Sequence, residues 1–304
     1  MKKGLILSLV LLGLFAAGSF AIIGKQTYPF KMQDEWGNTI KFTKPPQRII
    51  SCMPSITEML YALDTEDMIV GVTENDNYPE SAKSKEKVGR DKMNLEKVVS
   101  LKPDLIVMLG DSQGPDIKKF RSMGLPVFVV DPKTARGVMY SLTLLGEAVN
   151  RPHAAYSLTQ RMDRKLNWVM ARVKNSKKKR PLVFLEVWHK PLITAGGGTF
   201  LNDVIEKAGG RNVGKGAMGK YPEYSFEKLL AEDPDVIIIP KQNVRNPEQI
   251  YNDGKWKKLR AVRTGRVLFI DADIISRPGP RIVSAVEEIG TFLYGWKEGN
   301  DDEK

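Results

Sequence analysis

The sequence predicts an α/β protein of two Rossmann-like lobes, each with a parallel central sheet, joined by a single long interdomain helix. Strands alternate with amphipathic helices along the chain, and one helix-turn-strand unit occurs twice. A long amphipathic segment in the middle of the chain supplies the connection. With 304 residues, of which 42% are hydrophobic, the chain is long enough to build two cores.

Short apolar runs mark the strands, because strands buried on both faces need no alternation of apolar and polar residues. In the first half, strands are expected at residues 48–51, 68–72, 105–109 and 127–130, and helices at 56–63 and 95–101. In the second half, strands are expected at residues 182–186, 236–239 and 267–270, and helices at 201–208, 226–231 and 281–294. A polar lead-in with a hairpin around Trp36 precedes the first strand.

The two halves share a repeated unit. Residues 95–109 (LEKVVSLKPDLIVML) align without gaps with residues 226–240 (FEKLLAEDPDVIIIP), and residues 127–131 (VFVVD) resemble residues 267–271 (VLFID). In the longer unit a proline stops the helix, because proline lacks the N–H donor and fixes φ. The alternative is that all helix-turn-strand units look alike, but the match in register favours a duplication.

Between the halves, an amphipathic helix is expected from Pro152 to about residue 175, with apolar side chains at spacings of three and four. At 1.5 Å per residue it would span roughly 35 Å, about the width of one lobe. A single stiff connector permits modest hinge motion and suits a ligand cleft between the lobes. The expected organisation is a signal peptide (1–21), an N-terminal lobe (22–151), the linking helix (152–176) and a C-terminal lobe (177–304).

The N-terminus has the pattern of a secretory leader. Lys2 and Lys3 precede a small and apolar run that ends at Ala21, which predicts export and a mature chain that begins at residue 22. The alternative is a retained membrane anchor, since about 18 apolar residues could span a bilayer. The single cysteine, Cys52, is too far from the leader for lipid attachment and cannot form an internal disulfide.

The net charge is basic, with 47 Lys and Arg against 36 Asp and Glu, and removal of the leader leaves 45 against 36. This excess suits an anionic ligand or is a solvated basic face. The basic residues are scattered apart from the run at 177–180, so nucleic-acid binding is not expected.

The sequence offers little for catalysis, and no enzyme activity, catalytic residue or direct metal ligand is predicted. It contains no His-Glu-x-x-His helix, and its only histidines are His153 and His189. A pair of Cys52 and His189 across the cleft is a conceivable nucleophilic arrangement. The glycine-rich turn at residues 196–199 could hold an anionic group but lacks the Lys-Ser/Thr ending of a nucleotide loop.

Ligands of open parallel sheets bind at the carboxyl ends of the strands, so the loops there hold the candidate residues. Aromatic side chains in these loops offer flat apolar faces to a macrocycle or a catechol. The predicted ligand-binding residues are Met53, Ser55, Tyr78, Arg90, Asp91, Asp111, Trp188, His189, Thr199, Tyr221, Tyr224 and Arg277.

Several motifs in order resemble the Fe/B12 family of periplasmic binding proteins over nearly the whole mature chain. They are PQRIIS at 46–51, NYP at 77–79, NLEKVVSLKPDLIV at 94–107, TAGGGTF at 194–200 and RPGPRI at 277–282. The resemblance implies a monomeric, extracytoplasmic solute-binding component of an ABC importer, with no cofactor, that carries a metal chelate to the permease. It also implies that Glu96 and Glu227, one per lobe and equivalent in the repeat, dock into arginine pockets of the permease.

The nature of the chelate stays open. The motif set favours cobalamin or a related corrinoid, yet this chain has Arg90 and Ile274 where cobalamin-binding members present tryptophans, while Tyr221 keeps an aromatic. Arg90, Arg277 and Arg281 would instead complement a ferric siderophore or heme. The sequence also allows a chelatase-type enzyme on the same architecture or a purely structural envelope protein.

Overall fold

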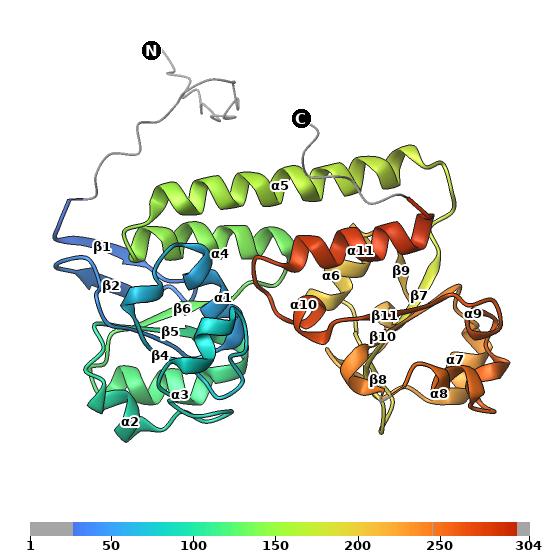
Figure 1. Ribbon diagram of the computed structural model, residues 1–304, viewed down its shortest axis with the longest axis horizontal. Helices are drawn as coiled ribbons and strands as arrows, with labels where there is room; N and C mark the ends of the chain where they lie inside the picture. The colour runs from blue at the N-terminus through green and yellow to red at the C-terminus, as the bar shows by residue number, and fades with distance from the viewer. Residues whose placement is uncertain (1–26, 245, 297–304) are drawn as a thin grey trace, which may run out of the picture.

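The computed structural model describes residues 27–244 and 246–296, which form two lobes bridged by one long helix (Figure 1). This helix, α5 (Pro152–Asn175), has 24 residues and confirms the predicted connector. Proline fits its first turn, where the backbone N–H has no helical acceptor. Ala155, Met162, Leu166 and Val169 are buried at spacings of three, four and seven, as the apolar periodicity requires.

The N-terminal lobe contains a parallel sheet in the order β4-β3-β5-β6. Its strands are β3 (Ile49–Ser51), β4 (Ile69–Gly71), β5 (Leu105–Leu109) and β6 (Val127–Val130). Its helices are α1 (Pro54–Ala62), α2 (Leu95–Ser100), α3 (Gly110–Ser122) and α4 (Ala135–Ala148). An antiparallel hairpin, β1 (Phe30–Gln33) and β2 (Thr39–Phe42), precedes the sheet and has Trp36 in its turn. The four predicted strands and the hairpin are confirmed.

The C-terminal lobe repeats this plan with the strand order β11-β10-β7, to which β8 adds antiparallel and β9 adds parallel, both on β7. Its strands are β7 (Leu182–Trp188), β8 (Ile193–Thr194), β9 (Arg211–Asn212), β10 (Val236–Pro240) and β11 (Val267–Ile270). Its helices are α6 (Phe200–Lys207), α7 (Phe226–Glu232), α8 (Glu248–Asn252), α9 (Arg260–Arg263), α10 (Ala272–Ser276) and α11 (Ile282–Tyr294). The three strands expected here are confirmed.

Several helical segments depart from the sequence expectation. Residues 110–112, expected in a loop, form the first turn of α3, where the non-helical backbone of Gln113 and the following Pro115 interrupt the helical pattern. Residues 274–276, also expected in a loop, end α10. Helices α4, α8 and α9 have no expected counterpart, although the buried side chains of α4 follow helical spacing.

The repeat in the sequence corresponds to equivalent structure in the two lobes. In the N-terminal lobe, the carboxylate of Asp104 accepts the backbone N–H of Arg48 at 2.8 Å, at the start of β3. In the C-terminal lobe, the carboxylate of Asp235 accepts the N–H of Leu182 at 2.7 Å, at the start of β7. The aspartate of each unit therefore satisfies a backbone donor that begins the neighbouring central strand.

One hydrophobic cluster extends through both lobes. It joins the inner faces of the two sheets to α4, α5, α6 and α11, with Leu142, Leu166, Ile205 and Ile289 among its fully buried members. Separate clusters fill the outer face of each sheet. Because close-packed interiors resist deformation, this shared core limits the rotation of one lobe against the other.

Within the described residues, no helix combines the length and apolar character that a bilayer crossing requires. The expected leader, residues 1–21, lies outside the described residues.

Candidate ligand-binding cleft

A cleft of about 430 Å³ lies between the lobes. One wall comes from the carboxyl ends of β5 and β6, and the other comes from the end of β7, the start of α6 and the segment before α7. Parallel strands of both sheets end here, which is where ligands of such folds bind. The polar and aromatic side chains that line it include Asp111, Asp131, Lys133, Thr199, Lys220 and Tyr221.

A charged bridge crosses this cleft. The carboxylate of Asp111 lies 2.5 Å from the Lys133 ammonium in its own lobe and 2.6 Å from the Lys220 ammonium in the C-terminal lobe. The hydrogen bonds from Lys133 and Lys220 lower the pKa of Asp111 below its ordinary value of 3.8. The three side chains are 48% to 65% exposed, so the bridge contributes little to stability.

Asp131, which follows β6, holds the N-terminal part of this bridge in place. Its carboxylate accepts the backbone N–H of Asp111 at 3.2 Å, the Lys133 ammonium at 2.6 Å and the indole N–H of Trp36 at 3.2 Å. A Cβ at Gly110 would lie 2.5 Å from the indole nitrogen, so glycine permits this close approach. Asp131 ends the repeated VFVVD unit, which is the sequence signal that could have identified it.

The glycine-rich turn before α6 shapes the opposite wall. A Cβ at Gly196 would lie 2.1 Å from the carbonyl oxygen of Gly219, so glycine lets the segment that carries Lys220 pack against the turn. The hydroxyl of Thr199 accepts the N–H of Asn202 at 3.1 Å and caps α6. Thr199 therefore lines the cleft and is also the N-cap residue of α6.

Three predicted aromatic residues are exposed: Tyr78 by 47%, Trp188 by 57% and Tyr221 by 52%. Tyr221 lines the cleft, and partial burial raises the pKa of its phenol, which keeps the hydroxyl protonated. Trp188 ends β7, where its indole N–H donates to the carbonyl of Lys190 at 2.9 Å. The ring of Tyr78 lies 4.0 Å from the guanidinium of Arg281, in the other lobe.

A second polar bridge between the lobes is buried. Glu58 in α1 is 3% exposed and accepts from Arg277 at 2.9 Å and from Arg281 at 2.6 and 2.8 Å. Beside it, the amide of Asn77 donates to Asp273 at 2.7 Å. Arg277 was expected to bind ligand, but its side chain is 13% exposed and held by Glu58 and Asp273. The structure places Arg277 in the contact between the lobes.

Ser55 and Tyr224 were also expected to bind ligand, but they are buried and are not among the described residues that line the cleft. Ser55 is 1% exposed within α1, and Tyr224 is 3% exposed. The ring of Tyr224 packs 5.7 Å from that of Phe184, and its hydroxyl donates to Glu232 at 2.8 Å. Both side chains are packed in the protein interior, because local packing rather than position after a strand decides exposure.

His189 and Cys52 do not meet. The His189 ring stacks on Trp256 with centroids 6.2 Å apart, and its Nδ1 lies 3.1 Å from the buried carboxylate of Glu186. Cys52 is fully buried in the core of the N-terminal lobe, and this burial raises the pKa of its thiol. A thiol that stays protonated is a poor nucleophile.

Met53, Arg90 and Asp91 are not among the described residues that line the cleft. Met53 is the N-cap residue of α1, and its carbonyl accepts the N–H of Thr57 at 3.0 Å. Arg90 pairs with Glu74 at 3.1 Å on the surface, and Asp91 is exposed beside it.

Glu96 and Glu227 are the second residues of α2 and α7, and both are exposed. The caps of these helices are equivalent: Asn94 and Ser225 each accept the N–H of the residue three positions later, at 3.0 and 3.1 Å. Figure 1 shows α2 and α7 on the side of each lobe that faces away from α5. Two carboxylates therefore occupy equivalent places on the two lobes.

Comparisons with known proteins agree with this geometry. The periplasmic binding protein family matches residues 49–274. The ABC transporter substrate-binding lipoprotein YvrC of Bacillus subtilis is 33% identical over 275 residues, 88% of this chain and 87% of that protein. The periplasmic vitamin B12-binding protein of Vibrio cholerae superposes with a TM-score of 0.74 at 29% identity, covering 82% of this chain and 97% of that one.

The periplasmic heme-binding protein BhuT, solved with two hemes, also superposes with a TM-score of 0.74, at 25% identity over 83% of this chain and 99% of that chain. The two relatives of known structure thus share the fold and differ in ligand. From the family match, the shared two-lobed fold and the cleft at the strand ends, the chain belongs to the periplasmic binding protein family as an ABC transporter substrate-binding protein.

Proposed function

We propose that this protein captures a corrinoid, such as cobalamin, in the cleft between its lobes and delivers it to the membrane permease. The charge balance of the cleft supports this ligand: Asp111 and Asp131 face Lys133 and Lys220, so the lining charges cancel. A large ligand with little net charge fits a neutral, polar cleft with an aromatic side chain, here Tyr221. The similarity to the vitamin B12-binding protein supports the same choice.

The dimensions of the cleft suggest how the ligand would sit. Its 430 Å³ lie in the lower part of the range of about 300–1,000 Å³ for small-molecule sites. A corrinoid is larger than this space, so it would extend beyond the walls and displace the ammonium of Lys220 from Asp111. Because that pair is exposed, opening it costs little.

Heme or a ferric siderophore is the alternative, favoured by one specific observation. Lys133 and Lys220 both converge on Asp111, and an anionic ligand could take the place of this carboxylate between the two ammonium groups. The similarity to the heme-binding protein BhuT supports this alternative.

The proposal includes a transport role without catalysis, in which the metal arrives within the ligand. Among the described residues, no three His, Cys, Asp or Glu side chains form a group that could hold a metal ion. The buried thiol of Cys52 likewise gives no support to a chelatase-type reaction.

We further propose that the exported protein works as a monomer outside the cytoplasm and that Glu96 and Glu227 contact the permease. Their equivalent positions on the two lobes suit a permease of two similar subunits, because each carboxylate then meets the same surface. The lobes would be residues 22–151 and 177–304, on either side of the linking segment 152–176.

Thermal unfolding of residues 22–304 with cyanocobalamin, hemin or a ferric catecholate siderophore tests the choice of ligand. A ligand present at about 100 times its Kd stabilises the folded state by about 2.7 kcal/mol. We expect cyanocobalamin to raise the Tm by several degrees and the other two to raise it less. A larger rise with hemin or the siderophore would replace the corrinoid, and no rise with any of the three would contradict the whole class.

A further inference from the structure

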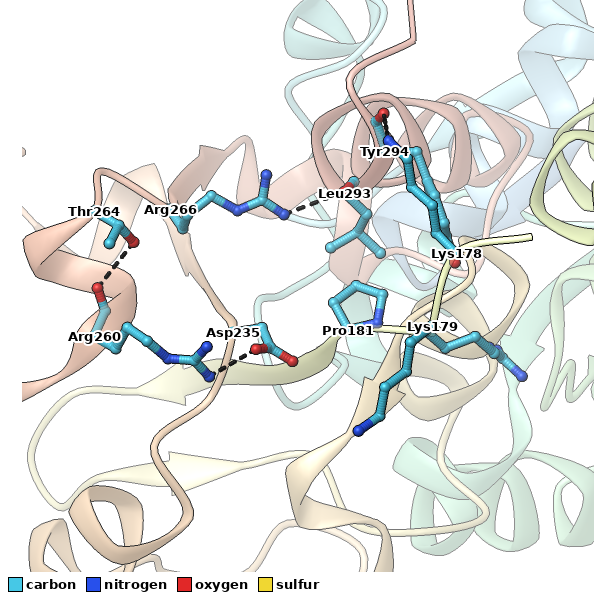
Figure 2. A pocket seen from close by; sticks show the side chains of 10 residues that line it. Lys178, Lys179, Pro181, Asp235, Arg260, Thr264, Arg266, Leu293 and Tyr294 are labelled. Atoms are coloured by element: carbon cyan, nitrogen blue, oxygen red, sulfur yellow. Dashed lines mark hydrogen bonds and ion pairs between the residues drawn. The ribbon is translucent and has the colours of Figure 1, made fainter. Parts of the chain in front are cut away.

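A second concavity lies in the C-terminal lobe, at the opposite end of the sheet from the ligand cleft. It encloses about 380 Å³ around the amino ends of β7, β10 and β11 (Figure 2). Five basic side chains line it, against a single acidic one, Asp235; the basic residues are Lys178, Lys179, Arg180, Arg260 and Arg266. This cluster contains most of the basic run at residues 177–180, which the transport function does not use.

The internal contacts of these side chains leave most of their charge without a counter-ion. Arg180 donates to the carbonyls of Glu206, Gly209 and Gly210 at the end of α6. Arg266 donates to the carbonyl of Leu293 at 3.1 Å. Carbonyl acceptors satisfy hydrogen bonds but carry no net charge, so these contacts leave both guanidinium groups as uncompensated cations.

The remaining three cations differ in their partners. Arg260 pairs with Asp235 at 2.7 Å, as Figure 2 shows, whereas Lys178 lies 3.3 Å from the carbonyl of Tyr294. For Lys179 there is no hydrogen bond or ion pair among residues 27–244 and 246–296. A concave surface with such an excess of positive charge attracts anions.

Acidic residues follow the rim of this concavity in the sequence. Tyr294 lines the concavity at the end of α11, and Trp296 stacks on it with ring centroids 4.9 Å apart. Four acidic residues follow within the next seven positions: Glu298, Asp301, Asp302 and Glu303. Since an extended chain covers about 3.3–3.6 Å per residue, all four carboxylates can reach the concavity.

We propose that this basic concavity is a carboxylate-binding site and that its occupant is the chain's own acidic segment, residues 298–303. The occupant would contact the connector at residues 176–181, through which α5 enters β7. Any movement between the linking helix and the C-terminal lobe passes through this connector. The bound segment would thus fix the joint between them, at a distance from the ligand cleft.

Zero-length carbodiimide cross-linking of residues 22–304 tests this site. The carbodiimide activates a carboxylate, a neighbouring lysine amine attacks it to form an amide bond, and the reagent leaves as a urea. The pairs Lys220–Asp111 and Lys215–Glu206, each 2.6 Å apart, serve as internal positive controls. Lys177 is a matched control, because it adjoins Lys178 on the same connector but does not line the concavity.

We expect cross-links from the segment 298–303 to Lys178 or Lys179 several-fold more often than to Lys177. This preference should disappear in about 1 M salt, where the Debye length is near 3 Å. It should fall in the variant D301N/D302N, which keeps two of the four carboxylates. A mixture of isotopically light and heavy chains shows whether the links lie within one molecule.

Three results would overturn the proposal. One is equal reaction with Lys177, which would indicate a segment that samples the surface at random. Another is cross-linking only between light and heavy chains, which would assign the occupant to a second copy. The third is protection of Lys179 from acylation by inorganic phosphate alone, without any cross-link, which would indicate a site for free anions.

Discussion

Two polar bridges connect the lobes, and they differ in burial. The bridge at Glu58 has its carboxylate 3% exposed and bound by two guanidinium groups, from Arg277 and Arg281. The bridge at Asp111 lies at the cleft, where the side chains of Asp111 and its partner Lys220 are each at least half exposed. Both join an acidic residue of the N-terminal lobe to basic residues of the C-terminal lobe.

Their different surroundings indicate different roles. A buried carboxylate without its partners would carry an uncompensated charge, so the Glu58 bridge has to stay closed while the protein is folded. An exposed pair exchanges its contacts for water at little cost, so the Asp111 bridge can open for a ligand. The first therefore fixes the lobes relative to one another, and the second marks where a ligand gains access.

The variant Glu58→Ala should have the largest effect, because it leaves two arginines at the contact between the lobes without their shared carboxylate. We expect a loss of about 3–5 kcal/mol in the free energy of unfolding, measured by urea denaturation. The control Glu74→Ala breaks the exposed pair with Arg90 and should cost less than about 1 kcal/mol. Similar losses in both variants would remove the distinction between buried and exposed pairs.

The variant Arg281→Lys should have an intermediate effect. It keeps the positive charge but loses the paired hydrogen bonds to Glu58 and weakens the contact with the ring of Tyr78. We expect the free energy of unfolding, measured by urea denaturation, to fall by about 1–2 kcal/mol, because one charged hydrogen bond to Glu58 remains. A loss as large as that of Glu58→Ala would mean that the geometry of the fork, rather than charge, stabilises this contact.

Opening the cleft bridge should cost little stability. We expect Lys220→Met to change the free energy of unfolding by less than about 1 kcal/mol, since both members of the pair are exposed. Its affinity for cyanocobalamin should be kept or increased, while affinity for hemin should fall with the lost ammonium group. A strongly reduced affinity for cyanocobalamin, measured by titration, would assign Lys220 to ligand contact instead.

The smallest effect is expected from the pH dependence of the same bridge. Hydrogen bonds from Lys133 and Lys220 hold the pKa of Asp111 below its ordinary value of 3.8, so the pKa of this carboxyl is lower in the folded than in the unfolded protein. The stabilisation is then present above pH 3.8 and is lost as the pH falls through the folded pKa. Wild type and Asp111→Asn should differ by a small constant amount at neutral pH and converge in acid; divergence in acid would contradict this sign.

Most of the fold could be predicted from the sequence, because buried parallel strands are continuous apolar runs between turn signals. The strands at residues 105–109, 127–130 and 267–270 have the predicted bounds. Helix α3 could not be predicted, since glycine, proline and the non-helical Gln113 break its pattern. The expectation failed there because helical periodicity presupposes an uninterrupted helix.

The candidate site was harder to predict, because tertiary contacts decide which side chains face the cleft. Position after a strand correctly indicated that Asp111, Thr199 and Tyr221 lie there. Position after a strand could not show that the side chain of Tyr224, three residues after Tyr221, is buried in the core. Nor could it reveal Glu58 as a contact between lobes, since a glutamate in an amphipathic helix is ordinarily a surface residue.

Calorimetric titration of cyanocobalamin into wild type and Tyr221→Ala tests the central claim most directly, since this aromatic residue lines the cleft and is half exposed. Stacking of an apolar face on an aromatic side chain contributes about 1 kcal/mol beyond the buried area. We predict saturable binding of one ligand per chain to wild type and binding at least severalfold weaker to the variant. Equal affinity in both chains would contradict binding in this cleft, and an absence of binding to folded wild type would contradict a corrinoid ligand.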